Sequence, residues 1–271
     1  MSSSVNPFVR TLLQNERFVE SATALWSGMP ISASGVVGSS CALAAVALFQ
    51  HGNGSMVAVT PTADAAEQVA EDLTLFLAEG EENVFLFPPM EQRESESALA
   101  IADESFGERL NVLKRLVTSA EHRSIVVVSM PALLQPVPPP ALLKERTQTL
   151  AVNNRVNVES LCHFLVEGGY HSTTAVDLPG EFAVRGYILD LFAPDWDQPV
   201  RIELFNDEIE SIRRFDLGTQ RSLEKMTEID LTRLQPYECT GASLLDYFSS
   251  TTPIILVEPA AILGQQTNEQ I

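Results

Sequence analysis

The chain has 271 residues, with 17 basic and 36 acidic side chains and a formal net charge of −19 at neutral pH. This charge repels phosphate backbones, so we expect no binding of nucleic acid by the chain alone. Its 45% apolar and 20% charged residues predict a globular protein, and no apolar run approaches the roughly 20 residues of a membrane span.

The first residues, "MSSSVNPFVRTLLQNERF", lack the continuous apolar core of a signal peptide, which predicts a cytoplasmic location. The three cysteines, Cys41, Cys162 and Cys239, are too widely spaced for a disulfide framework or a thiolate zinc site. We therefore expect reduced thiols and no metal.

The stretch "GVVGSSCA" (residues 35–42) lies where a nucleotide-binding enzyme carries its phosphate loop. A working loop reads G-x-x-x-x-G-K-[ST], because the lysine reaches the outer phosphates and the hydroxyl binds Mg²⁺. Here Ser40 replaces the second glycine, Cys41 the lysine and Ala42 the hydroxyl. Two interpretations are open: a glycine turn that caps a buried helix, or an inherited loop around Gly35 and Gly38 that has lost its chemistry. In either case we expect no cofactor.

Residues 1–146 alternate helical and strand-like patterns. "GSMVAVTPT", "ENVFLFPP" and "RSIVVVSMPALL" are typical of buried parallel strands, and the amphipathic helix "SFGERLNVLKRLVTSA" lies between the last two. This alternation predicts the first part of an α/β domain with a parallel sheet.

A proline-rich stretch near residue 140 predicts a boundary, followed by an α+β domain at residues 147–233. That domain has one helix, with Asn157 as N-cap and Gly168-Gly169 as its end, and then the strands "HSTTAV", "EFAVRGYILDLF", "QPVRIELFND" and "EIESIRRFD". Residues 234–271 contain a predicted helix, "TGASLLDYFSS", and a strand, "PIILVEP", that returns to the first sheet. No closing element follows that strand, so we expect a truncated domain and a longer polypeptide.

No catalytic constellation emerges from the remaining polar residues. Asp103 and Glu104 in "ALAIADESF" could imitate a Walker B pair, but the apolar run is short and a capped helix start is favoured. The four histidines (His51, His122, His163, His171) lack metal-ligand or acid–base spacing.

The strand "PVRIELF" has an unusual outer face. Alternation places Val200, Ile202 and Leu204 on one face and Arg201, Glu203 and Phe205 on the other. Arginine and aromatic residues are frequent anchors of protein interfaces, so this face predicts a docking site. The alternative is a single phenylalanine covered by the neighbouring domain or by a strand.

The series "FAVRGYILDLF", "RIELFNDEI" and "FDLGTQRSL", from Phe182 to Leu223, resembles motifs shared by the excision-repair protein UvrB and the N-terminal module of bacterial transcription-repair coupling factors, the Mfd family. The missing loop lysine favours the coupling factors. So does the interval Pro88–Ser105, which is short, acidic and free of the aromatic hairpin that UvrB inserts into DNA.

The resemblance implies a degenerate P-loop, helicase-like α/β domain of the UvrB type with an inserted α+β domain. It implies a non-enzymatic adaptor that recruits UvrA through Arg185, Arg201 and Phe205. Because Arg201 and Phe205 lie on the outer face of their strand, we expect Arg201→Glu and Phe205→Ala to leave the fold nearly unchanged. The further partners would be translocase and RNA-polymerase-binding domains of the same polypeptide, and DNA only indirectly. The alternatives are a UvrB-like helicase module that binds ATP through backbone groups of the loop, and a structural domain without a docking role.

Overall fold

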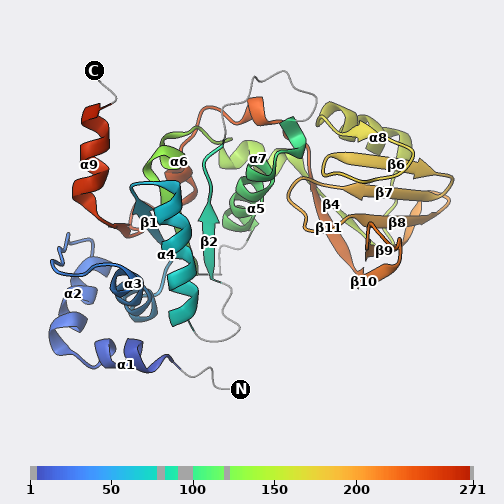
Figure 1. Ribbon diagram of the computed structural model, residues 1–271. Coiled ribbons are helices and arrows are strands. Elements are labelled where there is room, and N and C mark those ends of the chain that lie inside the picture. The colour runs from blue at the N-terminus through green and yellow to red at the C-terminus, as the bar shows by residue number, and fades with distance from the viewer. Residues whose placement is uncertain (1–4, 78–82, 91–99, 119–122, 269–271) are drawn as a thin grey trace. The chain divides into compact units, whose positions relative to one another are not determined.

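The computed structural model describes residues 5–77, 83–90, 100–118 and 123–268, and the chain divides into two compact units built from separate stretches of sequence (Figure 1). The first contains Met1–Pro89, Thr118–Gln135 and Leu244–Ile271, and the second contains Met90–Val117 and Pro136–Ser243. None of the described helices is both long and apolar enough to cross a membrane.

A parallel sheet of four strands, in the order β12-β1-β3-β2, forms the centre of the first unit. The strands are β1 (Met56–Thr60), β2 (Val84–Phe87), β3 (Ile125–Ser129) and β12 (Ile254–Leu256). Every residue of β1 and β3 is buried, as expected for apolar strands covered on both faces. Because β12 pairs with β1, the strand predicted from "PIILVEP" does join this sheet.

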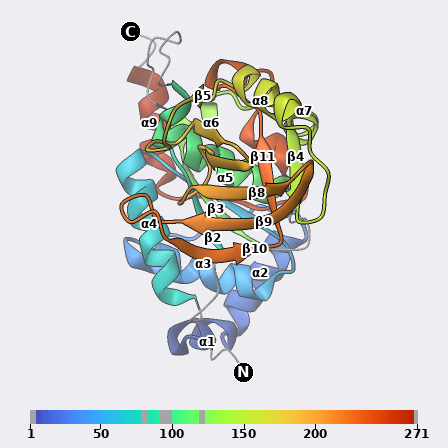
Figure 2. The ribbon, with the colours of Figure 1, turned by 90° about the vertical axis from the view of Figure 1, so that its right-hand side faces the viewer.

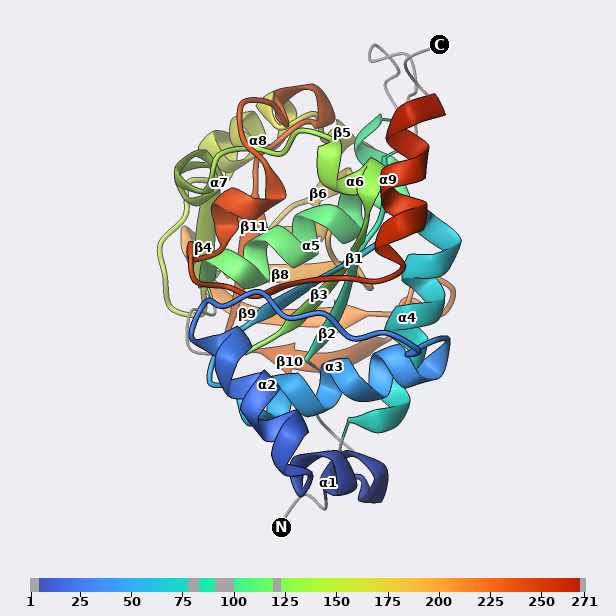
Figure 3. The ribbon, with the colours of Figure 1, turned by 90° about the vertical axis from the view of Figure 1, so that its left-hand side faces the viewer.

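The helices of the first unit begin where the sequence offers caps. They are α1 (Pro7–Leu13), α2 (Glu16–Trp26), α3 (Ser39–His51), α4 (Ala63–Phe76), α6 (Met130–Leu134) and α9 (Pro259–Asn268). Side-chain oxygens of Asn15, Thr62 and Ser129 accept backbone N–H bonds at the starts of α2, α4 and α6. Figure 3 shows α1 and α2 beside α3, and the buried side chains of α3 share one core with α4, β1 and β3.

The second unit is built on a six-stranded sheet in the order β10-β9-β8-β7-β6-β5, one face of which is turned to the viewer in Figure 2. Its strands are β5 (His171–Ser172), β6 (Glu181–Arg185), β7 (Ile188–Phe192), β8 (Val200–Phe205), β9 (Glu208–Phe215) and β10 (Ser222–Met226). All neighbours are antiparallel except β5 and β6. A separate antiparallel pair joins β4 (Thr147–Ala151) to β11 (Glu228–Thr232).

The described residues of the second unit also form the α-helices α5 (Glu104–Thr118), α7 (Pro140–Arg146) and α8 (Val158–Glu167). The prediction for α8 is confirmed. Asn157 accepts a bond from the Ser160 N–H at its start, and Gly168 caps its end. Gly169 follows with a φ of 84°, in the left-handed region that ends many helices.

Helix α5 belongs to the second unit, although its sequence lies within the residues expected to form the first domain. Gly107 permits close contact, because a Cβ there would lie 2.0 Å from the carbonyl oxygen of Pro194. The Nζ of Lys114 lies 2.5 Å from Oδ2 of Asp195 and 2.9 Å from the carbonyl oxygen of Asp230. The compact units therefore differ from the expected boundaries at residues 146 and 233, since residues 90–117, 136–146 and 234–243 join the α+β residues.

Several smaller predictions are wrong. "TGASLLDYFSS" forms only one 3₁₀ turn, Leu244–Tyr247, because its serines and threonines favour turns over a helix. "HSTTAV" contributes only the two residues of β5. The short polar strands β4, β10 and β11 were not foreseen, and α9 closes the segment after β12, where no closing element was expected.

Candidate protein-docking face

Two hairpins bring Arg185 of β6 to one side of β7 and Arg201 and Phe205 of β8 to its other side. A tight turn joins β6 to β7 at Gly186, whose φ of 62° lies in the left-handed region that favours glycine. The register then pairs Arg185 with Ile188, and Asp190 with Arg201 on β8. Strand β7 therefore lies between two strands that each carry an arginine.

The carboxylate of Asp190 holds both of these arginines. Arg201 donates from Nε to Oδ1 over 2.6 Å and from Nη2 to Oδ2 over 2.9 Å, and Nη2 of Arg185 forms an ion pair with Oδ2. Asp190 is only 1% exposed. A buried carboxylate is tolerated only when it is paired, so the fold depends on these guanidinium contacts.

Arg201 is tied into the unit more firmly than Arg185. Its guanidinium lies 4.6 Å from the ring centre of the buried Phe215, and Nη2 also lies 3.2 Å from Oε1 of Gln220. The hydrogen bond to Asp190 raises the pKa of Arg201 above its ordinary value, so the side chain stays charged. Its side chain is 18% exposed, against 50% for Arg185. Of the two arginines, Arg185 is therefore the more accessible.

Phe205 is the exposed aromatic of this face. Strand β8 alternates as predicted, with Val200, Ile202 and Leu204 buried and Phe205 70% exposed. Among the described residues of the second unit, no strand therefore covers Phe205. A side chain of this size in water is a candidate anchor for a partner.

The glycine loop has the geometry of a helix cap. Gly38 is the N-cap of α3 with a φ of 57°, and Gly35 also has a positive φ of 77°. The Val37 N–H donates to Oγ of Ser40 over 3.0 Å, and that hydroxyl donates to the Val37 carbonyl oxygen. The Cys41 N–H donates to the Gly38 carbonyl oxygen over 2.9 Å. Two of the N–H donors that a phosphate loop would turn toward its ligand are thus used within the loop.

The loop is also not the connector between strand and helix that a phosphate loop requires. Residues 27–38, all of them described, contain no strand, so this loop does not lead from a strand of the sheet into α3. Ala42, at the position of the missing hydroxyl, is buried in the core of the first unit. The parallel sheet is present, but this loop gives no support to a P-loop helicase-like fold.

Asp103 and Glu104 lie at the start of α5. Oδ1 of Asp103 lies 3.3 Å from the Phe106 N–H, which confirms a capped start of α5. Asp103 and Glu104 line a hollow of about 490 Å³ together with Asp195 and Asp197. An acidic lining repels phosphates, so this hollow does not suit a nucleotide.

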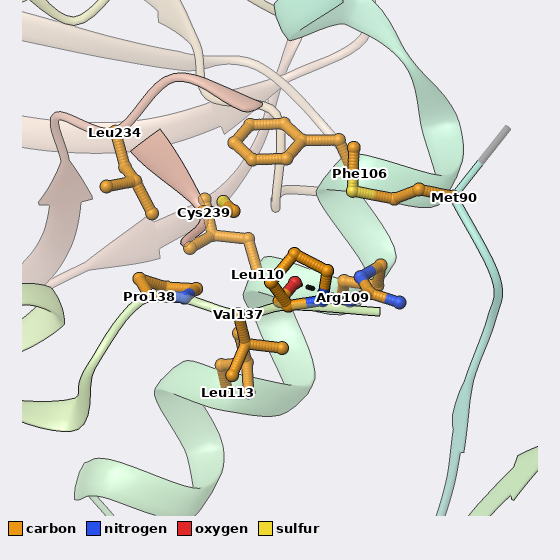
Figure 4. A pocket seen from close by; sticks show the side chains of 10 residues that line it. Met90, Phe106, Arg109, Leu110, Leu113, Val137, Pro138, Leu234 and Cys239 are labelled. Atoms are coloured by element: carbon orange, nitrogen blue, oxygen red, sulfur yellow. Dashed lines mark hydrogen bonds between the residues drawn. The ribbon is translucent and has the colours of Figure 1, made fainter. Parts of the chain in front are cut away.

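A small cavity lies near Arg109. It measures about 10 Å³, room for one water molecule at most, and Figure 4 shows Phe106, Leu110 and Leu113 around it. Burial lowers the pKa of Arg109 to about 10 and raises that of the nearby Cys239 thiol to about 12. Burial and the raised pKa both disfavour Cys239 as a nucleophile.

Sequence reasoning missed the acidic members of the docking face. Asp190 was quoted within "YILDLF" without a role, and Glu203 was placed on the outer face without a partner. In the structure Glu203 forms an ion pair with Arg213 of β9. The available signal was the alternation of β7. Asp190 lies between two leucines in the sequence, and alternation places it on the face opposite to theirs, which is the face of Arg201.

An exposed aromatic beside internally paired arginines, on a largely antiparallel sheet, makes this surface a candidate protein-docking face. Residues 149–237, which include this face, match the UvrB interaction domain family. The chain therefore carries a UvrB interaction domain.

The rest of the chain extends this similarity to larger proteins. It is 35% identical to the transcription-repair-coupling factor of Bacillus subtilis over 198 residues. The aligned region covers 73% of this chain and 16% of that protein. The corresponding protein of Myxococcus xanthus is 32% identical over 219 residues, 79% of this chain and 18% of that protein. That of Mycobacterium tuberculosis is 35% identical over 191 residues, 69% of this chain and 15% of that protein. The chain is thus a homologue of transcription-repair-coupling factors and spans less than a fifth of their length.

Proposed function

We propose that this chain is the adaptor module of a cytoplasmic transcription-repair coupling factor, which recruits UvrA to stalled RNA polymerase in transcription-coupled nucleotide excision repair. The module docks UvrA through Arg185, Arg201 and Phe205 and performs no nucleotide chemistry of its own. Translocation along DNA and polymerase binding belong to further domains of the polypeptide, so DNA is engaged only indirectly. The similarity to transcription-repair-coupling factors and the UvrB interaction domain support this proposal.

The observation that carries the proposal is the exposed Phe205 on the same sheet face as the Asp190-bound arginines. Phe205 lies four residues beyond Arg201, about 13 Å along the strand. A partner that covers this distance would bury the aromatic ring and face Arg185 with a carboxylate. Buried aromatic rings supply much of the energy of protein interfaces, and charged pairs set their orientation.

The test is binding of purified UvrA to the parent chain and to Phe205→Ala. Loss of a central aromatic anchor commonly costs about 2 kcal/mol or more, which weakens binding at least about thirtyfold. Phe8→Ala is the matched control, because Phe8 is similarly exposed at 66% but lies on α1 of the first unit. Equal binding by all three proteins would refute the assignment of Phe205, and a parent chain that does not bind UvrA would refute the function.

The alternative, a UvrB-like module that binds ATP, finds no support in the glycine loop. The loop lacks the lysine and the hydroxyl, and its Val37 and Cys41 N–H groups are bonded internally. Micromolar binding of Mg-ATP by the parent chain would favour this alternative.

A further inference from the structure

A row of basic side chains crosses three strands of the docking sheet. The register places Arg201 of β8 opposite Arg213 of β9, and Arg213 opposite Lys225 of β10. Residues directly opposite each other point to the same face of a sheet. Arg201, Arg213 and Lys225, which we call the basic row, therefore lie on one face, the face that carries Phe205.

Like charges at opposite positions of neighbouring strands repel each other and destabilise a sheet. The unit compensates the first two members of the row with carboxylates. Asp190 binds Arg201, as described, and Glu203 forms an ion pair with Arg213. Oγ of Ser211 donates to Oε2 of Glu203 over 2.8 Å and accepts from Nε of Arg213 over 3.2 Å. The arginines are thus held in fixed positions.

Lys225 is not compensated in this way. It is exposed, and its ammonium forms no ion pair with any residue that the structure describes. The adjacent Glu224 is engaged elsewhere, since its Oε2 lies 3.7 Å from Nη1 of Arg214. The row therefore ends in a free positive charge, in a chain whose net charge is −19.

We infer that Arg213 and Lys225 extend the docking face from β8 to β10 and receive an acidic strip of the partner protein. This inference rests on the proposed function. Neighbouring strands lie about 4.8 Å apart, so the row from Arg201 to Lys225 spans about 10 Å across the strands. The partner presents carboxylates over that distance, while its apolar part covers Phe205 farther along β8.

The surroundings of the row favour a protein over a nucleic acid. Asp190 and Glu203 are interleaved with the cations and would repel a continuous phosphate backbone. The net charge of the chain opposes nucleic acid at longer range as well. A protein surface can instead place each carboxylate opposite one cation.

Lys225→Glu is a sharp test, because it cannot weaken binding merely by unfolding the sheet. A glutamate at this position faces Arg213 across the strand pair, so it replaces a repulsion by an attraction and the melting temperature should not fall. Lys144→Glu is the matched control, with the same change of charge on α7 of the same unit. We expect Lys225→Glu to weaken UvrA binding about three- to tenfold, chiefly in the association rate and less at high salt, and Lys144→Glu to bind like the parent.

The outcomes separate the two proposals. If the parent and Lys225→Glu bind UvrA equally well, the extension to β10 is wrong while the function proposed above stands. If the parent does not bind UvrA, both the proposed function and the extension to β10 are refuted. If Lys225→Glu loses affinity for duplex DNA that the parent binds, and keeps its affinity for UvrA, the row serves phosphates and the inference is overturned.

Discussion

The glycine loop of the first unit and the sheet face of the second both carry residues typical of ligand binding, but they use them differently. In the loop, backbone donors and the Ser40 hydroxyl bond to each other, and Ala42 is part of the core. On the sheet, Asp190 fixes two arginines, yet Arg185 and Phe205 remain accessible. Accessible groups held in place by buried partners distinguish a docking surface from a loop that only caps a helix.

The largest expected effect concerns the internal pairing of the sheet face. Arg201→Glu removes the bidentate partner of the buried Asp190 and places a second carboxylate beside it. Breaking a buried ion pair commonly costs about 3–5 kcal/mol, and we expect a loss of this size in the free energy of unfolding, measured by urea denaturation. This replaces the sequence-based expectation that the fold would be unchanged.

The control for this experiment is Arg155→Glu. Arg155 belongs to the same unit, and its side chain is 79% exposed. Its variant should unfold close to the parent. If both variants unfold like the parent, Asp190 does not depend on Arg201, and the internal network is not a determinant of stability.

The second largest effect is expected at Ala42, which stands where a phosphate loop has its hydroxyl. The substitution tests whether this position belongs to the hydrophobic core. Ala42→Thr adds two heavy atoms, one of them polar, to a site that is 1% exposed, and overpacking of this kind costs about 1–3 kcal/mol. Thermal unfolding should show a lower midpoint than that of Ala260→Thr, the same change at an exposed position of α9. A variant as stable as Ala260→Thr would show that room for a phosphate-loop hydroxyl remains.

An effect of similar size is expected at the cap of α3. Gly38 has a φ of 57° with nothing near the position of a Cβ, so Gly38→Ala meets backbone strain without a clash. With a ψ of −141°, this backbone conformation is used almost only by glycine and costs an alanine about 1–3 kcal/mol. Gly264→Ala in α9 is the opposite control, since its backbone is helical and alanine is preferred there. Equal shifts of the two variants in urea denaturation would contradict the conformation of the loop.

The last prediction is that the chain does not bind Mg-ATP. Calorimetric titration of the parent chain with Mg-ATP should show no binding at micromolar concentrations, because the loop has neither lysine nor Mg²⁺-binding hydroxyl. Cys41→Lys should not restore binding, since the Val37 and Cys41 N–H groups already have acceptors. Restored binding in Cys41→Lys would show that these internal bonds give way to a phosphate.

Part of this architecture is determined by local sequence. Period-two alternation correctly assigned the buried and exposed faces of β8, the continuous apolar runs predicted the buried strands β1 and β3, and Asn157 and Gly168 marked the ends of α8. These features depend on side chains a few residues apart, so their physics can be read from the chain alone.

Only the tertiary structure decided what the docking face contains. Alternation places Asp190, Arg201, Arg213 and Lys225 on outer faces of four strands, but their alignment depends on the register that the hairpins impose. The burial of Asp190 beneath its arginines and the packing of α5 against Pro194 through Gly107 were likewise visible only in the folded structure. Such contacts join residues far apart in the sequence, and their energies arise from burial and charge pairing that no local pattern specifies.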